Sequence, residues 1–135
     1  MPRPVVHFEV IGTNPEQLRS YYSDLFGWNF DTPSPVAREV SDVDSYGFIE
    51  LVTAEDGTGI RGGIGGGDGY DSHAVFYVGV QDVEGALARA ERLGGTRVMG
   101  PARSPNGLMV GHFKDPEGSL IGVAGVDPNQ LAETE

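Results

Sequence analysis

The feature that most constrains this chain is a strand and helix pattern that occurs twice. Residues 5–10 alternate apolar and polar side chains, which predicts a half-buried strand with His7 on its polar side. Residues 72–80 repeat this alternation and contain His73, 66 residues after His7. Each predicted strand is followed by a helical pattern, and the leucines near the two helix ends, Leu25 and Leu93, lie 68 residues apart. Because the offset changes by only two residues, a duplicated unit explains the pattern.

Both predicted helices have start and stop signals. Asn14 can cap the first helix, Pro15 suits its first position, and Gln17 completes a capping box. Gly27 provides the left-handed stop. The apolar residues of this helix share one face, which predicts that it covers a sheet: Leu18, Tyr21, Tyr22 and Leu25. The second helix follows Asp82, ends at Gly94 and Gly95, and has its own apolar face: Val83, Ala86, Leu87, Ala90 and Leu93.

Three further strands are predicted after each helix. In the first half they lie at residues 28–30, at 46–52 and within the glycine-rich stretch 57–69, where the sequence does not fix the register. In the second half they lie at 96–99, 108–113 and 120–124. Each half is therefore β-α-β-β-β, and we expect one α+β domain over residues 1–135. Module one spans about 4–66, module two about 72–126, and residues 127–135 form a polar tail.

The composition excludes several classes of function. The chain has 9 Lys and Arg against 20 Asp and Glu, a formal net charge of −11, so nucleic acids and anionic membranes are not expected partners. The chain has no cysteine, which excludes disulfides, thiolate nucleophiles and cysteine-based zinc sites. The apolar runs are far shorter than the roughly 20 residues of a bilayer span, and the first residues lack the apolar region of a signal peptide. We therefore expect a cytoplasmic protein.

The order of these elements and three local motifs resemble the vicinal oxygen chelate superfamily of glyoxalases, bleomycin-resistance proteins and extradiol dioxygenases. The motifs are a histidine in the first strand of each half, a helix that ends in Leu93-Gly94-Gly95, and the turn at residues 115–118, Asp-Pro-Glu-Gly. The resemblance covers residues 4–126. It implies two modules whose sheets form a cup, and a divalent metal in the catalytic members. Each module of such members supplies two ligands, one from its first strand and one from its last.

Transferred to this sequence, the resemblance places the first-strand metal ligands at His7 and His73. The last-strand ligands, usually Glu, correspond to Gly122 and to a position near Gly62, so both carboxylates are missing. Two neutral imidazoles alone leave the charge of a divalent ion uncompensated. We therefore expect no cofactor, although a divalent metal stays possible if Glu9 or Glu50 completes a site of two histidines and one carboxylate.

The sequence favours ligand binding over catalysis, and it assigns no catalytic residue. We expect the protein to hold a small aromatic or cationic molecule in a metal-poor cup lined by His7, Glu9, Phe48, Glu50, His73 and Tyr77. One alternative is a metal-dependent lyase, isomerase or ring-cleaving dioxygenase that uses His7 and His73. A second is metal-free acid–base catalysis by a histidine beside Glu9, and a third is a non-catalytic dimeric interaction module. The resemblance also implies a homodimer. The alternation does not assign a face to His112, for which a surface or structural role is expected over a ligand role.

Overall fold

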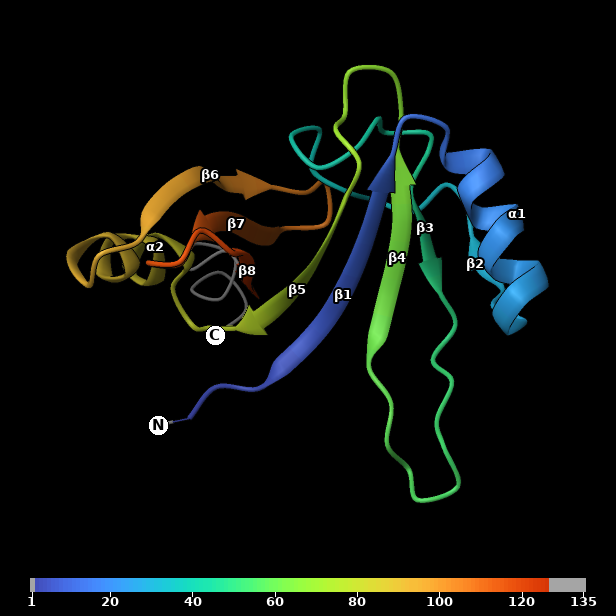
Figure 1. The fold of residues 1–135 in the computed structure, drawn as a ribbon, viewed down its shortest axis with the longest axis horizontal. Helices are drawn as coiled ribbons and strands as arrows, with labels where there is room; N and C mark the ends of the chain where they lie inside the picture. Colours follow the sequence, from blue (N-terminus) through green and yellow to red (C-terminus); the bar gives the residue numbers. More distant parts are fainter. Residues whose placement is uncertain (1, 127–135) are drawn as a thin grey trace. The chain divides into compact units, whose positions relative to one another are not determined.

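The computed structural model describes residues 2–126, which divide into two compact units. The first unit is Val6–Val75, and the second consists of the described residues 2–5 and 76–126. The elements follow the order β-α-β-β-β twice (Figure 1), which confirms an α+β fold with two such modules. The predicted tail at 127–135 lies outside the described residues. Among residues 2–126, neither helix has the length and apolar character needed to cross a bilayer.

The first unit is a sheet of four strands with one helix. Its elements are β1 (Val5–Gly12), α1 (Pro15–Phe26), β2 (Phe30–Asp31), β3 (Gly47–Ile49) and β4 (Arg61–Gly66). The strands lie in the order β2-β3-β4-β1, with β1 parallel to β4 and β3 antiparallel to β4. The first strand thus lies beside the fourth.

Helix α1 begins and ends at the predicted signals but covers less of the sheet than its pattern predicts. Asn14 Oδ1 accepts a hydrogen bond from the Gln17 backbone N–H at 3.2 Å, and Gly27 has a φ of +74°. None of the residues of α1, all of which the structure describes, is buried, and both Tyr21 and Leu25 are exposed. The prediction that these two residues pack on the sheet is wrong. The rings of the region pack against one another instead, in stacked and tilted pairs: Phe8, Tyr22, Phe26 and Trp28.

Strand β3 is shorter than predicted. The alternation continues to residue 52, but β3 ends at Ile49, and the chain then leaves the sheet as a long loop before β4 (Figure 1). Leu51 and Val52 are exposed in this loop, so their apolar side chains gain no burial from continuing the strand. The glycine-rich stretch forms a regular strand, β4, in which Gly62 to Gly66 are all buried.

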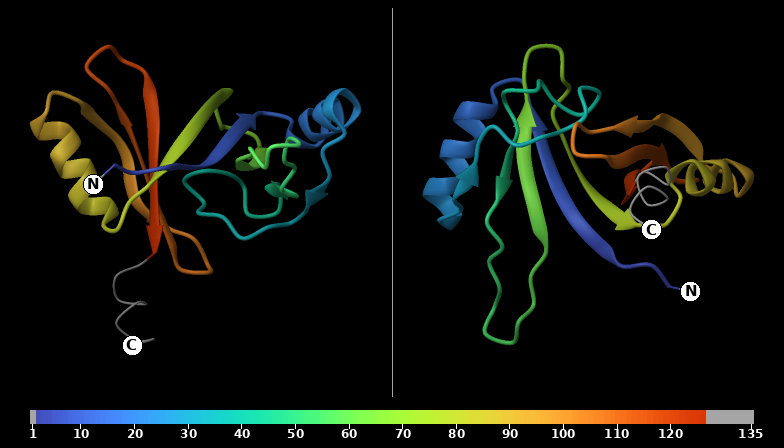
Figure 2. Two further views of the ribbon diagram at one scale, coloured as in Figure 1. Left: turned by 90° about the horizontal axis from the view of Figure 1, so that it is seen from below. Right: turned by 180° about the vertical axis from the view of Figure 1, so that it is seen from behind.

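The second unit repeats this layout. Strand β5 (His73–Gly79) begins in the first unit and continues into the second, which also contains α2 (Val83–Arg92), β6 (Thr96–Arg103), β7 (Leu108–Lys114) and β8 (Leu120–Val126). The strand order is β5-β8-β7-β6, and α2 lies along the sheet (Figure 2). The predicted turn before β8 is closed by Asp115, whose Oδ1 accepts hydrogen bonds from the backbone N–H groups of Glu117 and Ser119 at 2.9 and 3.0 Å.

Helix α2 anchors the second unit through two residues of its predicted face. Val83 and Leu87 are buried and form a cluster with Val123 of β8. Leu93 follows the last helical residue and is 68% exposed, so the predicted apolar face ends before it.

We expect Leu87→Ala to lower the free energy of unfolding by about 2–5 kcal/mol, because it leaves a cavity in a packed cluster. Urea denaturation followed by circular dichroism measures the change. Leu93→Ala is the matched control, since its exposed side chain should cost less than about 0.5 kcal/mol. Equal losses from the two variants would contradict the placement of α2.

Candidate functional site

Strand β1 presents different side chains to its two faces. Phe8 lies on the side toward which a Cβ at Gly62 would point, because that Cβ would come within 2.3 Å of the Phe8 ring. His7 and Glu9 alternate with Phe8 and lie on the other side. Glu9 and Phe48 both pair with Gly63, one from each neighbouring strand. His7, Glu9 and Phe48 therefore share one face of the first unit, which we call the His7 face.

The Tyr46 hydroxyl connects the two titratable side chains of this face. It donates a hydrogen bond to Glu9 Oε1 at 2.9 Å and lies 3.0 Å from His7 Nε2. Tyr46 is 1% exposed and Glu9 is 3% exposed, so the connection is buried. Since the hydroxyl proton is directed to Glu9, the hydroxyl oxygen accepts from His7, and Nε2 carries a hydrogen. The result is a hydrogen-bond chain from imidazole through phenol to carboxylate.

Two glycines of β4 allow Tyr46 to reach β1. A Cβ at Gly63 would lie 2.3 Å from both Oη and Cε1 of Tyr46, and one at Gly65 would lie 2.6 Å from Cδ2 of the same ring. The ring therefore crosses β4 where that strand has no side chains. The sheet pairing supplies the register that the sequence left open. Gly63 belongs to the face of His7 and Gly62 to the opposite face, because neighbouring residues of a strand face opposite sides.

The imidazole of His7 is held in a partly apolar environment. The Phe48 ring meets it edge-on, with centroids 5.8 Å apart and an interplanar angle of 89°. Burial lowers the pKa of His7 from 6.5 to about 4. His7 is therefore neutral near pH 7. The half-buried rings of His7 and Phe48 share this face with the buried carboxylate of Glu9, a combination that can contact a flat or cationic molecule.

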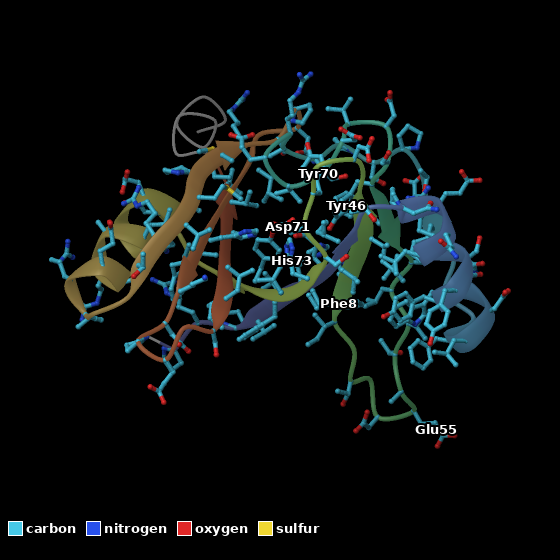
Figure 3. The ribbon with its side chains drawn as sticks, turned by 45° about the horizontal axis from the view of Figure 1, so that its top comes forward. Phe8, Tyr46, Glu55, Tyr70, Asp71 and His73 are labelled. Carbon is cyan, nitrogen blue, oxygen red and sulfur yellow. The ribbon has the colours of Figure 1, made fainter. Side chains whose placement is uncertain are left out.

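Glu50 and His73 are the other predicted residues of the first unit. Glu50 follows the last residue of β3 and is exposed, and its backbone N–H donates to the Asn29 carbonyl at 3.1 Å. Because β3 ends at Ile49, the alternation of side chains along this strand does not extend to Glu50. The strand therefore does not direct the Glu50 side chain to the His7 face. His73 is half-buried at the start of β5, and its Nδ1 lies 2.8 Å from the Asp71 carbonyl oxygen (Figure 3).

A second tyrosine and histidine pair occurs in the second unit. Tyr77 Oη lies 2.7 Å from His112 Nε2, and both residues are buried. Tyr77 and His112 pair with Gly122 from opposite sides, and a Cβ at Gly122 would lie 2.5 Å from Cδ1 of Tyr77. The Tyr77 ring thus crosses a glycine of β8, as the Tyr46 ring crosses a glycine of β4. The face of His112, which its own strand pattern left open, is set by this pairing.

Sequence reasoning missed Tyr46 as a member of the site. Tyr46 and Phe48 are two residues apart, so an extended chain directs both side chains to the same face. This spacing is the signal in the sequence that could have identified Tyr46. The fact that decides its role is tertiary, because the ring crosses a strand that lies 15 residues or more further along the chain.

The divalent metal that the family resemblance implies does not fit the donors of this face. Residues 2–126 contain no group of three His, Asp or Glu side chains placed to hold a metal ion. The Nε2 atom of His7 is engaged with the Tyr46 hydroxyl, and position 63 supplies no donor atom. A tight divalent site needs an anionic, correctly placed donor set, which these residues do not provide.

Comparison with known proteins is consistent with this architecture. Residues 5–123 match the family model of the Glyoxalase/Bleomycin resistance protein/Dioxygenase superfamily. The chain belongs to this superfamily. No sequence among the functionally curated proteins matches it.

Solved structures with a similar fold include two methylmalonyl-CoA epimerases. One is a variant from Streptomyces coelicolor in complex with 2-nitronate-propionyl-CoA, with 15% identity, a TM-score of 0.61, and coverage of 90% of this chain and 96% of that chain. The other, from Mycobacterium tuberculosis, has 14% identity, a TM-score of 0.55, and coverage of 95% of this chain and 91% of that chain. At these identities the likeness shows the fold alone.

We expect Gly63→Ala to lower the free energy of unfolding by about 1–3 kcal/mol, because the new methyl group overlaps the Tyr46 ring. The same substitution in a Tyr46→Ala background should cost much less, since the overlapping ring is gone. A double-mutant cycle measured by urea denaturation gives the coupling between the two positions. Additive losses would contradict the crossing of β4 by Tyr46.

The lowered pKa of His7 predicts acid sensitivity. The unfolded chain takes up the His7 proton near pH 6.5 and the folded protein only near pH 4, so stability falls as the pH drops through this interval. The loss from this group should be on the order of 3 kcal/mol. We expect urea denaturation between pH 7 and pH 4 to show a steeper loss in the wild type than in His7→Gln. Parallel pH profiles would contradict the burial of a neutral His7.

Proposed function

We propose that the protein binds a small aromatic or cationic molecule at the His7 face of the first unit. The observation that carries this proposal is the hydrogen-bond chain of His7, Tyr46 and Glu9, which fixes a neutral imidazole and a carboxylate beside the Phe48 ring. His7 and Phe48 remain half-buried, so their rings keep surface for a ligand. Membership of a superfamily that is named for enzymes and a resistance protein supports small-molecule binding as the general function.

The chemistry of this face favours positive or neutral ligands. Phe48 and the neutral His7 offer two ring surfaces, and aromatic rings attract both other rings and cations. Glu9 adds an acidic group to the same face, and the chain has a net charge of −11. An anionic ligand would meet repulsion from both sources. His73 belongs to the proposed site as a second imidazole of the first unit, whereas Tyr77 is engaged with His112 in the second unit and Glu50 is exposed.

A metal-free proton transfer is the second candidate function. The Tyr46 hydroxyl joins a carboxylate to an imidazole, and such a chain can pass a proton between Glu9 and a bound molecule. The metal-dependent lyase and dioxygenase hypotheses have no support from the donors of the His7 face. A homodimer and a cytoplasmic location stay predictions from the sequence.

We expect benzyltrimethylammonium to raise the melting temperature of the protein, because a molecule that binds only the folded state stabilises it. Benzoate, which has a ring of the same size but a negative charge, should have no effect. Phe48→Ala should weaken the binding of the cation about tenfold, the loss expected for one cation–π contact. Isothermal titration calorimetry measures this change.

Phe26→Ala is the matched control for this experiment. Phe26 is an aromatic residue of the same unit that lies on α1 and is 57% exposed, so its loss should leave binding unchanged. Stabilisation by benzoate equal to that by the cation, or equal losses in the Phe26 and Phe48 variants, would refute the proposed site.

A further inference from the structure

We infer that Tyr46, the residue before β3, occupies the space from which a β4 side chain would complete a metal site in the first unit. Its hydroxyl also contacts Nε2 of His7 and Oε1 of Glu9, so a cation could reach these two atoms only by displacing the hydroxyl. This inference rests on the same face as the proposed function, but it requires no organic ligand.

The first line of support is the geometry of β4. Position 63 lies beside Glu9 in the sheet register and on the same face. A side chain at Gly63 would have to begin at a point only 2.3 Å from Oη and Cε1 of Tyr46. A carboxylate at position 63 and the Tyr46 ring therefore exclude each other. The tyrosine is not simply near the missing ligand but fills the volume of its first side-chain atoms.

The second line of support is the protonation of His7. A metal ion binds the nitrogen that carries a lone pair, whereas the Tyr46 hydroxyl receives a hydrogen bond from Nε2 of His7. Metal binding at this nitrogen would require the other tautomer and the loss of that bond. It would also displace a hydroxyl that is almost completely buried, and an unsatisfied buried polar group is costly.

The third line of support is the recurrence of the arrangement in the second unit. There the Tyr77 ring crosses Gly122 and its hydroxyl meets Nε2 of His112. The two rings start from different places, since Tyr46 precedes β3 and reaches across β4 toward β1, whereas Tyr77 lies in β5 and reaches across β8 toward β7. The shared element is a tyrosine over a glycine of the last strand of the module. Both modules thus combine a missing strand side chain with a histidine that is bound by a phenol.

Removal of Tyr46 should therefore make the His7 face convertible into a cation site. With the ring absent, a glutamate at position 63 would stand next to Glu9 and diagonally from His7 on two paired strands. These three side chains would supply one imidazole and two carboxylates, a donor set that divalent transition metals accept.

The test compares metal binding by untagged, chelator-treated proteins, using calorimetry and thermal unfolding with Ni²⁺ and Zn²⁺. We expect Tyr46→Ala/Gly63→Glu to bind at least about 100-fold more tightly than the wild type. The matched control is Tyr46→Ala/Gly63→Gln, which has the same shape without the charge and should resemble the wild type. Addition of His7→Ala to the glutamate variant should abolish the gain. Saturable metal binding by the wild type through His7, or equal binding by the Glu and Gln variants, would overturn the inference.

A second measurement needs no variant and decides the question if the double variants fail to fold. Nitrogen-detected NMR of the wild type should show His7 as the tautomer with hydrogen on Nε2, and Zn²⁺ should leave its ring signals unchanged. The other tautomer, or a shift of the His7 signals upon addition of Zn²⁺, would overturn the inference. Failure of the benzyltrimethylammonium titration would remove the proposed function without affecting this result.

Discussion

The hydrogen bonds of the Tyr46 hydroxyl are the interaction on which the His7 face depends. Glu9 is 3% exposed, and a carboxylate buried to this degree is costly unless it is hydrogen-bonded. Tyr46 supplies that bond from the position before β3, a strand that is not adjacent to β1, and it does so only because β4 has glycines at positions 63 and 65. The glycines of β4 and the burial of Glu9 on β1 therefore depend on each other.

The parts of the fold that sequence reasoning predicted are those specified by local chemistry. Asn14 and Gly27 set the ends of α1 through a cap and a left-handed residue, and Asp115 closes the turn before β8. These signals act within a few residues of the chain and need no tertiary information. The length of β3 could not be predicted in this way, because Leu51 and Val52 continue an apolar alternation but find nothing to pack against.

The candidate site shows the same division. The alternation of β1 correctly aimed His7 and Glu9 away from Phe8, because side chains of a strand alternate wherever the strand is regular. Tyr46 and His112 could not be assigned, because each takes its role from pairing with a distant strand. The register of the glycine-rich strand stayed open in the sequence, since glycines carry no side-chain pattern that would fix it.

The crossing of β4 by Tyr46 also constrains how this protein can evolve. A carboxylate regained at position 63 alone would collide with the ring, and loss of the ring alone would leave Glu9 without its phenol partner. Either substitution made first gives a less stable protein, so a chelating ligand set requires both changes together. The tyrosine and the glycine therefore each disfavour replacement of the other.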